Sequence, residues 1–483
     1  MPSTETSTRT WKIDQLPTRT HHPHLTHFAQ NLAGRTLKAA LFIAAVYLFT
    51  RLVCLLLAPT NVWMWLVWGL ESESLQDPGW LYALALHRPS IPPPKKLRLD
   101  LTSANQTDLP TVDIIIPCCG EADDIILDTV RTARAIHYPS SHARVVLLDD
   151  TSSPSLRAAI TTLNLPRHRN IHYHTRGPKT DPADFDKAGN LNYALATLPN
   201  PAPFVAVLDA DTLAHPDFLR ATLPHLLPNP RVALVGSPQH YYNIPPGDPL
   251  HQSFTWYVQL LTPSLNAYGL AMATGSGFVV RRSALTTVNG FSNLTSTEDI
   301  MLSCALHHAD YHVLVLPEVL QYGLAPPSVK GYAFQQSRWA SGLAVGLLAL
   351  QDGPRNNLPD GLRPRIAFQG FRHLWSHLYR VVALLGVPMA VCSGKPLVPG
   401  VALRMQTVLA CWVLALVWLL EGMRVAGAGF RVGVFAHFEG VWLAGANSWQ
   451  ETSSPPSTSS SQKTHAETNR KTEPEPDPDP NHP

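Results

Sequence analysis

Short β-branched runs alternate with segments of helical pattern between residues 112 and 235, and this alternation restricts the fold more than any other feature of the sequence. Alternation of this kind indicates a mostly parallel sheet with helices on both faces, because parallel strands need crossover connections. We therefore predict an α/β, Rossmann-like domain. The expected strands are 112–116, 144–148, 171–174, 204–208 and 231–235. The expected helices are 125–136, 156–163, 187–198 and 216–227.

Acidic residues follow three of these expected strands. They are Glu121 after the first, Asp149 and Asp150 at the end of the second, and Asp209 and Asp211 at the end of the fourth. Ligands in such sheets bind at the carboxyl ends of the strands. Grouped carboxylates repel one another unless a cation lies among them, and oxygen ligands of this kind suit Mg²⁺ or Mn²⁺ bridged to a diphosphate. Strand-end aspartates also cap helices, so the Asp-x-Asp sequence alone leaves both interpretations open.

Other nucleotide-binding and metal-binding patterns are missing from the sequence. There is no GxGxxG or GxxxxGK[ST] run, which disfavours a dinucleotide-binding or P-loop domain. The six cysteines have neither CxxC nor zinc-ligand spacing, so we expect reduced thiols in a cytosol-facing protein.

Apolar segments before and after this region predict membrane helices. The chain is 45% hydrophobic and only 15% charged. Residues 37–57 form an apolar run long enough to cross a bilayer, interrupted by Arg51, and residues 62–86 form either a second crossing or an interfacial helix. Basic residues flank this pair on both sides, which favours a hairpin with both ends cytosolic.

The C-terminal third predicts further membrane segments. Residues 340–350 suit a helix on the membrane surface, 374–392 and 401–420 suit crossings, and 430–446 is a weaker third. The expected organisation is a disordered cytosolic tail (1–35), a transmembrane region (36–88), a Pro-rich linker (89–110), a cytosolic catalytic domain (111–351), a second transmembrane region of two or three helices (370–446) and a disordered tail (449–483).

Five motifs in order carry a family resemblance that covers roughly residues 112–350. They are Asp149-Asp150, Phe185-Asp186-Lys187-Ala188-Gly189-Asn190-Leu191-Asn192, Asp209-Ala210-Asp211, Thr297-Glu298-Asp299 and Gln335-x-x-Arg338-Trp339. The series resembles the D, DxD, TED, QxxRW signature of the processive family 2 glycosyltransferases, especially the cellulose synthases. The resemblance implies a GT-A-type domain that uses Mg²⁺ or Mn²⁺.

The resemblance also implies roles for individual residues. Catalysis would involve Asp299 as general base, with Asp150 and Arg338. Donor binding would involve Glu121, Asp149, Lys187, Asp209, Gln335 and Arg338. The acceptor would meet Trp339, Gly275, Ser276 and Glu298, and the metal would bind Asp209 and Asp211.

Some of these residues have structural alternatives. Lys187 also suits a helix surface, Trp339 a membrane-interface anchor and Gln335 an amphipathic helix. The pair Cys118-Cys119 stands where relatives tend to have Thr-Tyr, so a nucleotide-contacting aromatic residue is missing. The FxVTxKG gating loop of polymer-extruding relatives is also not found.

The predicted function is that of a membrane-bound inverting glycosyltransferase that transfers a sugar, with UDP-glucose as the expected donor, to a growing β-glycan. One alternative is a non-processive transferase that adds a single sugar to a lipid or small acceptor. Another is a catalytically silent subunit of a synthase complex. The expected partners are a UDP-sugar, a glycan or glycolipid acceptor, membrane lipid and further subunits or copies, with no nucleic acid. We expect a multi-pass membrane protein with its catalytic domain in the cytosol. The expected membrane is the plasma membrane or that of the Golgi and other endomembranes.

Overall fold

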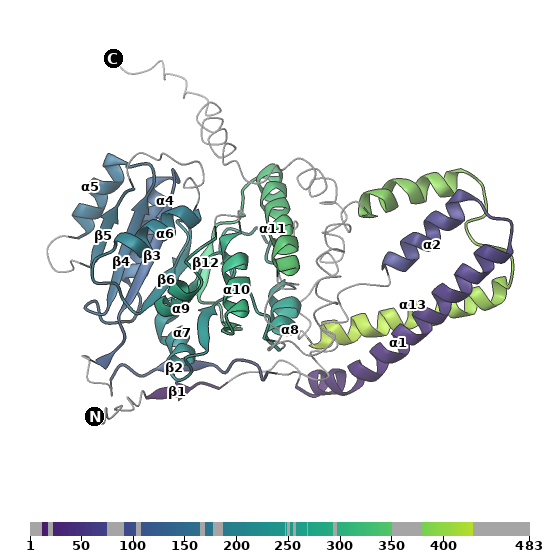
Figure 1. Cartoon of the computed structure of the whole chain (residues 1–483), viewed down its shortest axis with the longest axis horizontal. Helices are drawn as coiled ribbons and strands as arrows, with labels where there is room; N and C mark the ends of the chain where they lie inside the picture. The colour runs from purple at the N-terminus through teal and green to yellow at the C-terminus, as the bar shows by residue number, and fades with distance from the viewer. Residues whose placement is uncertain are drawn as a thin grey trace, which may run out of the picture.

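The structure is a computed structural model that combines an α/β domain with a group of long helices (Figure 1). It describes residues 12–17, 23–74, 91–102, 108–164, 170–176, 187–246, 248, 252–254, 257–267, 269–292, 297–349 and 379–427. The predictions for residues 430–446 and 449–483, and for Phe185 and Asp186, fall outside the described residues.

A seven-stranded sheet in the order β11-β8-β10-β6-β3-β4-β5 forms the centre of the α/β domain. All five predicted strands are present, and β10 is the one strand that runs antiparallel to its neighbours. To this sheet the structure adds two strands that were not predicted, β10 and β11. The bounds are β3 (Val112–Cys118), β4 (Ala143–Asp149), β5 (Ile171–His174), β6 (Phe204–Val207), β8 (Val232–Gly236), β10 (Phe278–Arg281) and β11 (His312–Val315).

Helices cover both faces of this sheet, as predicted. The four expected helices are α4 (Asp123–Arg134), α5 (Pro154–Leu163), α6 (Lys187–Thr197) and α7 (Phe218–Leu226). Successive residues of β3 enter two different cores, because side chains of a strand alternate between faces. Ile114 packs in one core with Ile126 of α4, whereas Ile115 packs in the other with Leu191 of α6. Each buried aliphatic side chain contributes about 1.5–3 kcal/mol relative to exposure.

A small three-stranded sheet and four further helices complete the domain. The small sheet has the order β7-β12-β9, with β7 (Leu213–Ala214), β12 (Gln321–Gly323) and β9 (His240–Tyr241). The helices are α8 (Thr262–Ala267), α9 (Arg282–Thr287), α10 (Glu298–His308) and α11 (Val329–Ala349), and a π-helix precedes α8 at Tyr257–Leu261. Figure 1 shows α8, α10 and α11 between the large sheet and the long helices.

The long helices α1 (Pro23–Leu57) and α13 (Leu403–Gly427) contain segments that are long and apolar enough to cross a membrane. These segments are Arg35–Leu57, with mean hydropathy 2.4, and Leu403–Met423, with mean hydropathy 1.8. Tyr379–Cys392 is a shorter apolar helix. The described part of the predicted segment 62–86 is helix α2 (Val62–Ser74), and residues 75–86 lie outside the described residues.

Arg51, the charge inside the first apolar run, is buried where α1, α2 and α13 meet. Its side chain is 1% exposed, and its Nη2 atom lies 3.1 Å from a carboxylate oxygen of Glu71 in α2. Its Nη1 atom donates to Gln406 of α13 at 3.2 Å. The ionised interruption therefore joins helices together instead of facing the outside of the group.

The N-terminal segment differs from the disordered tail predicted for residues 1–35. Strand β1 (Ile13–Gln15) pairs antiparallel with β2 (Leu97–Leu99), which lies within the predicted linker, and α1 already begins at Pro23. Backbone pairing gives this short segment a fixed position that its composition does not indicate. The segments on both sides of the α1–α2 hairpin therefore meet.

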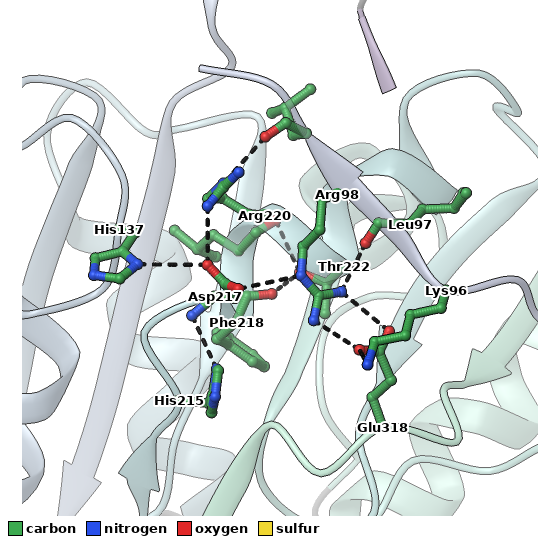
Figure 2. A network of polar contacts seen from close by, with 12 residues as sticks. Lys96, Leu97, Arg98, His137, His215, Asp217, Phe218, Arg220, Thr222 and Glu318 are labelled. Atoms are coloured by element: carbon green, nitrogen blue, oxygen red, sulfur yellow. Dashed lines mark hydrogen bonds and ion pairs between the residues drawn. The ribbon is translucent and has the colours of Figure 1, made fainter. Parts of the chain in front are cut away.

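Arg98 attaches this two-stranded sheet to the α/β domain. Figure 2 shows its guanidinium between Glu318 and Asp217. Its Nη2 atom lies 2.7 Å from Glu318, and its Nε atom lies 3.3 Å from Asp217. Both the arginine and Glu318 are about nine-tenths buried, with side chains 9% and 10% exposed.

Candidate active site

Three neighbouring strands of the large sheet carry the predicted acidic residues to one edge. β6, β3 and β4 are adjacent and parallel, so their carboxyl ends lie together. Asp209 follows β6, Glu121 follows β3, and Asp149 ends β4. The sheet order, which the sequence does not reveal, makes these positions neighbours.

Lys187, the first residue of α6, joins three of the segments that surround this edge. Its ammonium nitrogen lies 2.6 Å from Asp209 and 2.7 Å from Glu298, and it donates to the Gly275 carbonyl at 2.6 Å. Burial opposes its charge, but the two carboxylates outweigh burial and raise the pKa of Lys187. Lys187 is therefore a cation within a group of carboxylates, and a free position on a helix surface is ruled out.

Gly275 lies in the loop that contacts the Lys187 ammonium. Its φ of +67° lies in the left-handed region that favours glycine. Its N–H donates to the Asp299 carboxylate at 2.6 Å, so the same residue contacts both Asp299 and Lys187. A Cβ atom at this position would lie 3.8 Å from Asp209 and 3.9 Å from Asp299, which places Gly275 between the two predicted acidic motifs.

Ser276 lies beneath the carboxylates, in contrast to its predicted role in acceptor binding. The residue is fully buried. Its hydroxyl accepts from the Asp209 N–H at 2.9 Å and donates to Thr212 at 3.1 Å. Because these two bonds use the hydroxyl inside the protein, Ser276 positions Asp209 and does not face a ligand.

Gln321, which the sequence did not single out, supports the same loop from below. Its amide nitrogen donates to the Ser237 carbonyl at 2.7 Å and to the Ser276 carbonyl at 2.9 Å. It is fully buried, and it fills the space beside Gly277, whose φ is +62°. No local pattern marks this glutamine, because its partners lie 45 and 84 residues away.

Asp299 lies in the first turn of α10 and is buried. Burial and the adjacent Glu298 raise its pKa, although Lys187 acts in the opposite direction. A carboxylate with a raised pKa is a better proton acceptor than a free aspartate, which suits a general base.

At Asp211 the effects of burial and of neighbouring carboxylates outweigh the positive charge of Lys187. Burial and the neighbouring Asp209 raise the pKa of Asp211 to about 7. Among the described residues no three His, Cys, Asp or Glu side chains form a complete protein metal site. Two carboxylates with excess negative charge suit an ion that takes its other ligands from water and phosphate, as Mg²⁺ and Mn²⁺ do. The residues present therefore fit the predicted cation.

Glu121 lies on the same edge, where its carboxylate accepts from the Cys119 N–H at 2.6 Å. Desolvation by the surrounding residues, followed by the charges of Asp209 and Asp149, raises its pKa. It is a third acidic group near the proposed cation.

Asp149 and Asp150 are held by protein groups. Asp149 accepts from Thr151 at 2.7 Å and from the Tyr173 hydroxyl at 2.6 Å, among other bonds. Burial raises its pKa, but these hydrogen bonds have the larger combined effect and leave the pKa below the usual value. Asp150 forms a two-bond ion pair with Arg176, at 2.8 and 2.6 Å. The sequence identified neither Tyr173 nor Arg176, and both lie on or just after β5.

The three predicted residues of α11 lie in one turn of that helix. Among the described residues, the buried Oε1 atom of Gln335 and the buried Nε atom of Arg338 have no hydrogen-bond partner. The Trp339 ring packs against Phe254, with 5.1 Å between centroids and an interplanar angle of 58°. The helix therefore presents unsatisfied polar atoms beside an aromatic group.

Comparison with known families and proteins agrees with this geometry. A family model described as "Glycosyl transferase family 2" matches residues 113–288, and one described as "Glycosyl transferase family group 2" matches residues 204–437. Together these ranges contain the large sheet and all the candidate residues.

Two curated relatives are cellulose synthases. "Cellulose synthase 2" of Novacetimonas hansenii is 28% identical over 247 residues, which are 50% of this chain and 15% of the relative. The "cellulose synthase catalytic subunit [UDP-forming]" of Xanthomonas axonopodis pv. citri is 32% identical over 251 residues, which are 50% of this chain and 32% of the relative. The chain thus spans about a third or less of the length of these relatives.

A solved structure has the same fold. The mannosyltransferase PcManGT from Pyrobaculum calidifontis, in complex with GDP-Man and Mn²⁺, matches with a TM-score of 0.52 and 19% sequence identity. The match covers 76% of this chain and 96% of that one. At this identity the likeness concerns the fold alone.

Proposed function

Because the chain belongs to glycosyltransferase family 2 and has the GT-A-type α/β fold, we propose that it is an inverting, UDP-sugar-dependent hexosyltransferase that extends a β-glycan, as a cellulose synthase does. The observation that carries this proposal is the contact of Lys187 with both Asp209 and Glu298, together with the bond from Gly275 to Asp299. Three segments far apart in the sequence thereby form one charged site.

On the donor side, Asp209 and Asp211 would hold a divalent cation together with the diphosphate of the UDP-sugar. When bound, this cation stabilises the negative charge that develops on the departing UDP. The Mn²⁺ in the mannosyltransferase of the same fold supports a divalent ion, Mg²⁺ or Mn²⁺. Lys187 and Arg338 supply positive charge for the diphosphate, and Glu121, Asp149, Asp150 and Gln335 complete the proposed donor side.

On the acceptor side, Asp299 would take the proton from the attacking hydroxyl. Attack on the face of the anomeric carbon opposite UDP converts an α-linked donor into a β-linked product. Gly275 fixes the orientation of the Asp299 carboxylate, and Glu298 lies next to it in the chain. The Trp339 indole would stack on the apolar face of the acceptor sugar.

The apolar segments of α1 and α13 support a membrane-bound protein. Its catalytic domain would lie in the cytosol. The outer surfaces of these helices are apolar, with Phe42 and Trp418 each 70% exposed. The pairing of β1 with β2 supports a hairpin whose two ends lie on one side of the membrane.

The test is transfer by membranes that carry the protein. These membranes are incubated with a panel of labelled UDP-sugars, with UDP-glucose expected to be used, in Mg²⁺ or Mn²⁺. The products are then sized after digestion with linkage-specific glycosidases. Long β-linked chains support the proposal, whereas addition of a single sugar supports the non-processive alternative. A related active synthase is assayed in parallel as a positive control. If that synthase gives product and this protein gives none with any donor, the result supports the silent-subunit alternative.

A further inference from the structure

The hydroxyl of Tyr241 is a buried polar group that the described part of the chain leaves without a hydrogen-bond partner. Tyr241 is 8% exposed. Burial of a hydroxyl without a partner is unfavourable, and most buried polar groups in proteins are satisfied. A ligand that supplies the missing partner gives a reason for such a group.

The strand pairing of the small sheet places Tyr241 close to the Asp-x-Asp motif. Strand β7 starts two residues after Asp211 and pairs with β12, which in turn pairs with β9, the strand that contains Tyr241. Tyr241 lies opposite Gly323, one residue beyond the pair formed by Tyr322 and Leu213. The chain from Leu213 leads back towards Asp211, so Tyr241 lies on the Asp211 side of the small sheet.

Packing contacts hold the ring of Tyr241, whereas its hydroxyl has no hydrogen-bond partner in the described residues. A Cβ atom at Gly323 would lie 3.6 Å from two ring carbons, so the ring lies against the backbone of β12 at this residue. Phe254 also packs against this ring, with 6.0 Å between centroids and an interplanar angle of 61°, and Phe254 in turn contacts Trp339 of α11.

The charged groups that act on this hydroxyl have opposite signs. They are the carboxylates of Asp211 and Asp209 and the guanidinium of Arg338. The pKa of Tyr241 lies far above its usual value. Burial is the main cause, and the charges of the two carboxylates are the next. The phenol therefore keeps its proton and can donate a hydrogen bond to an anion.

We infer that the Tyr241 hydroxyl donates a hydrogen bond to a phosphate oxygen of the nucleoside diphosphate, between the Asp-x-Asp carboxylates and Arg338. This inference rests on the proposed function, because the donor supplies the phosphate. A phosphate oxygen fits this position because two positive groups would attract it. One is the cation held by Asp209 and Asp211, and the other is the Arg338 guanidinium. Buried polar atoms of Gln335 and Arg338 are also unsatisfied in the described residues, which supports a polar ligand at this place.

The test compares Tyr241→Phe with a matched control, Tyr322→Phe. Tyr241→Phe removes the hydroxyl and keeps the ring that packs on Phe254. Tyr322, in the neighbouring strand β12, is 39% exposed, and its hydroxyl is not one of the buried unsatisfied groups. Binding of UDP and of uridine, which has no phosphate, is measured by titration calorimetry in Mn²⁺, and thermal unfolding is measured without ligand.

Tyr241→Phe should bind UDP about 10- to 100-fold more weakly, the range for a lost hydrogen bond to a charged group. Uridine affinity should stay unchanged, and the melting temperature without ligand should be no lower than that of the unmodified protein. Tyr322→Phe should bind both ligands normally. UDP affinity of Tyr241→Phe within twofold of the unmodified protein would overturn the inference, and a loss of transfer in that case would indicate an acceptor contact. Failure of the unmodified protein to bind UDP would refute the proposed donor as well.

Discussion

The backbone N–H of Gly275 donates to the carboxylate of Asp299 at 2.6 Å, and this bond fixes the direction of the proposed base. The carbonyl of the same glycine accepts from Lys187, which also contacts Asp209 on the donor side. One residue with a left-handed backbone therefore links the two halves of the proposed reaction, and a side chain at this position would strain the backbone.

Replacement of the proposed base should separate chemistry from binding. Asp299→Asn is nearly isosteric, so UDP-sugar affinity should stay close to native while the transfer rate falls by about 10² to 10⁴, the range for lost general-base assistance. Donor titration and turnover are measured in the same membranes. Asp128→Asn, whose side chain is 61% exposed on α4, is the matched control and should retain full activity. Near-native turnover of Asp299→Asn would make Thr297-Glu298-Asp299 a structural motif.

The dependence of transfer on pH should report the raised pKa of Asp299. The base acts only when ionised, so kcat/KM should rise with pH as the carboxyl loses its proton. Because burial and Glu298 raise this pKa, the acidic limb should lie well above the usual aspartate value of about 4. The measurement is kcat/KM at subsaturating donor across the acidic and neutral range, with protein stability checked at each pH. A profile that stays flat down to about pH 5 would contradict the role of Asp299.

Removal of the metal ligand or of the metal should have the same effect. Asp211→Ala should abolish transfer and weaken UDP binding in Mn²⁺, because the cation links the carboxylates to the diphosphate. EDTA should do the same to the unmodified protein, and added Mn²⁺ should restore only the unmodified protein. UDP binding is measured by titration calorimetry, with Asp124→Ala, an exposed acidic residue of α4, as the control. Binding that is indifferent to both treatments would remove the metal from the mechanism.

Loss of Arg98 should destabilise the protein far more than loss of a surface arginine. Arg98→Met removes the closer cationic partner of the buried Glu318 carboxylate and leaves it only Lys96, at 3.5 Å and 38% exposed. Breaking one side of a buried ion pair costs about 3–5 kcal/mol, and Lys96 offsets part of this loss. Arg131→Ala removes an exposed pair with Asp128 and should change stability by less than about 1 kcal/mol. Thermal unfolding of the purified variants provides the comparison. Equal stability of the two variants would show that the two-stranded sheet is not held by this network.

The sequence by itself determined the α/β alternation and the acidic residues at the ends of β4 and β6. Local periodicity and the residue types within a strand or helix and at its ends determine these features, so short segments of the sequence predict them. The four helices predicted between the strands begin and end within two residues of α4, α5, α6 and α7. Lys187, Asp209 and Asp299 belong to three of the predicted motifs, and the structure brings them together, since Lys187 contacts Asp209 and Gly275 contacts both Lys187 and Asp299.

Only the tertiary structure decided which of the candidate side chains are exposed and which are already engaged. The family resemblance implied that Ser276 contacts the acceptor, but its hydroxyl is already hydrogen-bonded to the Asp209 N–H and to Thr212. The ion pair of Asp150 with Arg176 and the unsatisfied hydroxyl of Tyr241 likewise depend on strand pairing. Such contacts join residues that are distant in sequence. Their energies depend on burial and on the order of the strands in the sheet, and no local pattern of residue types predicts these.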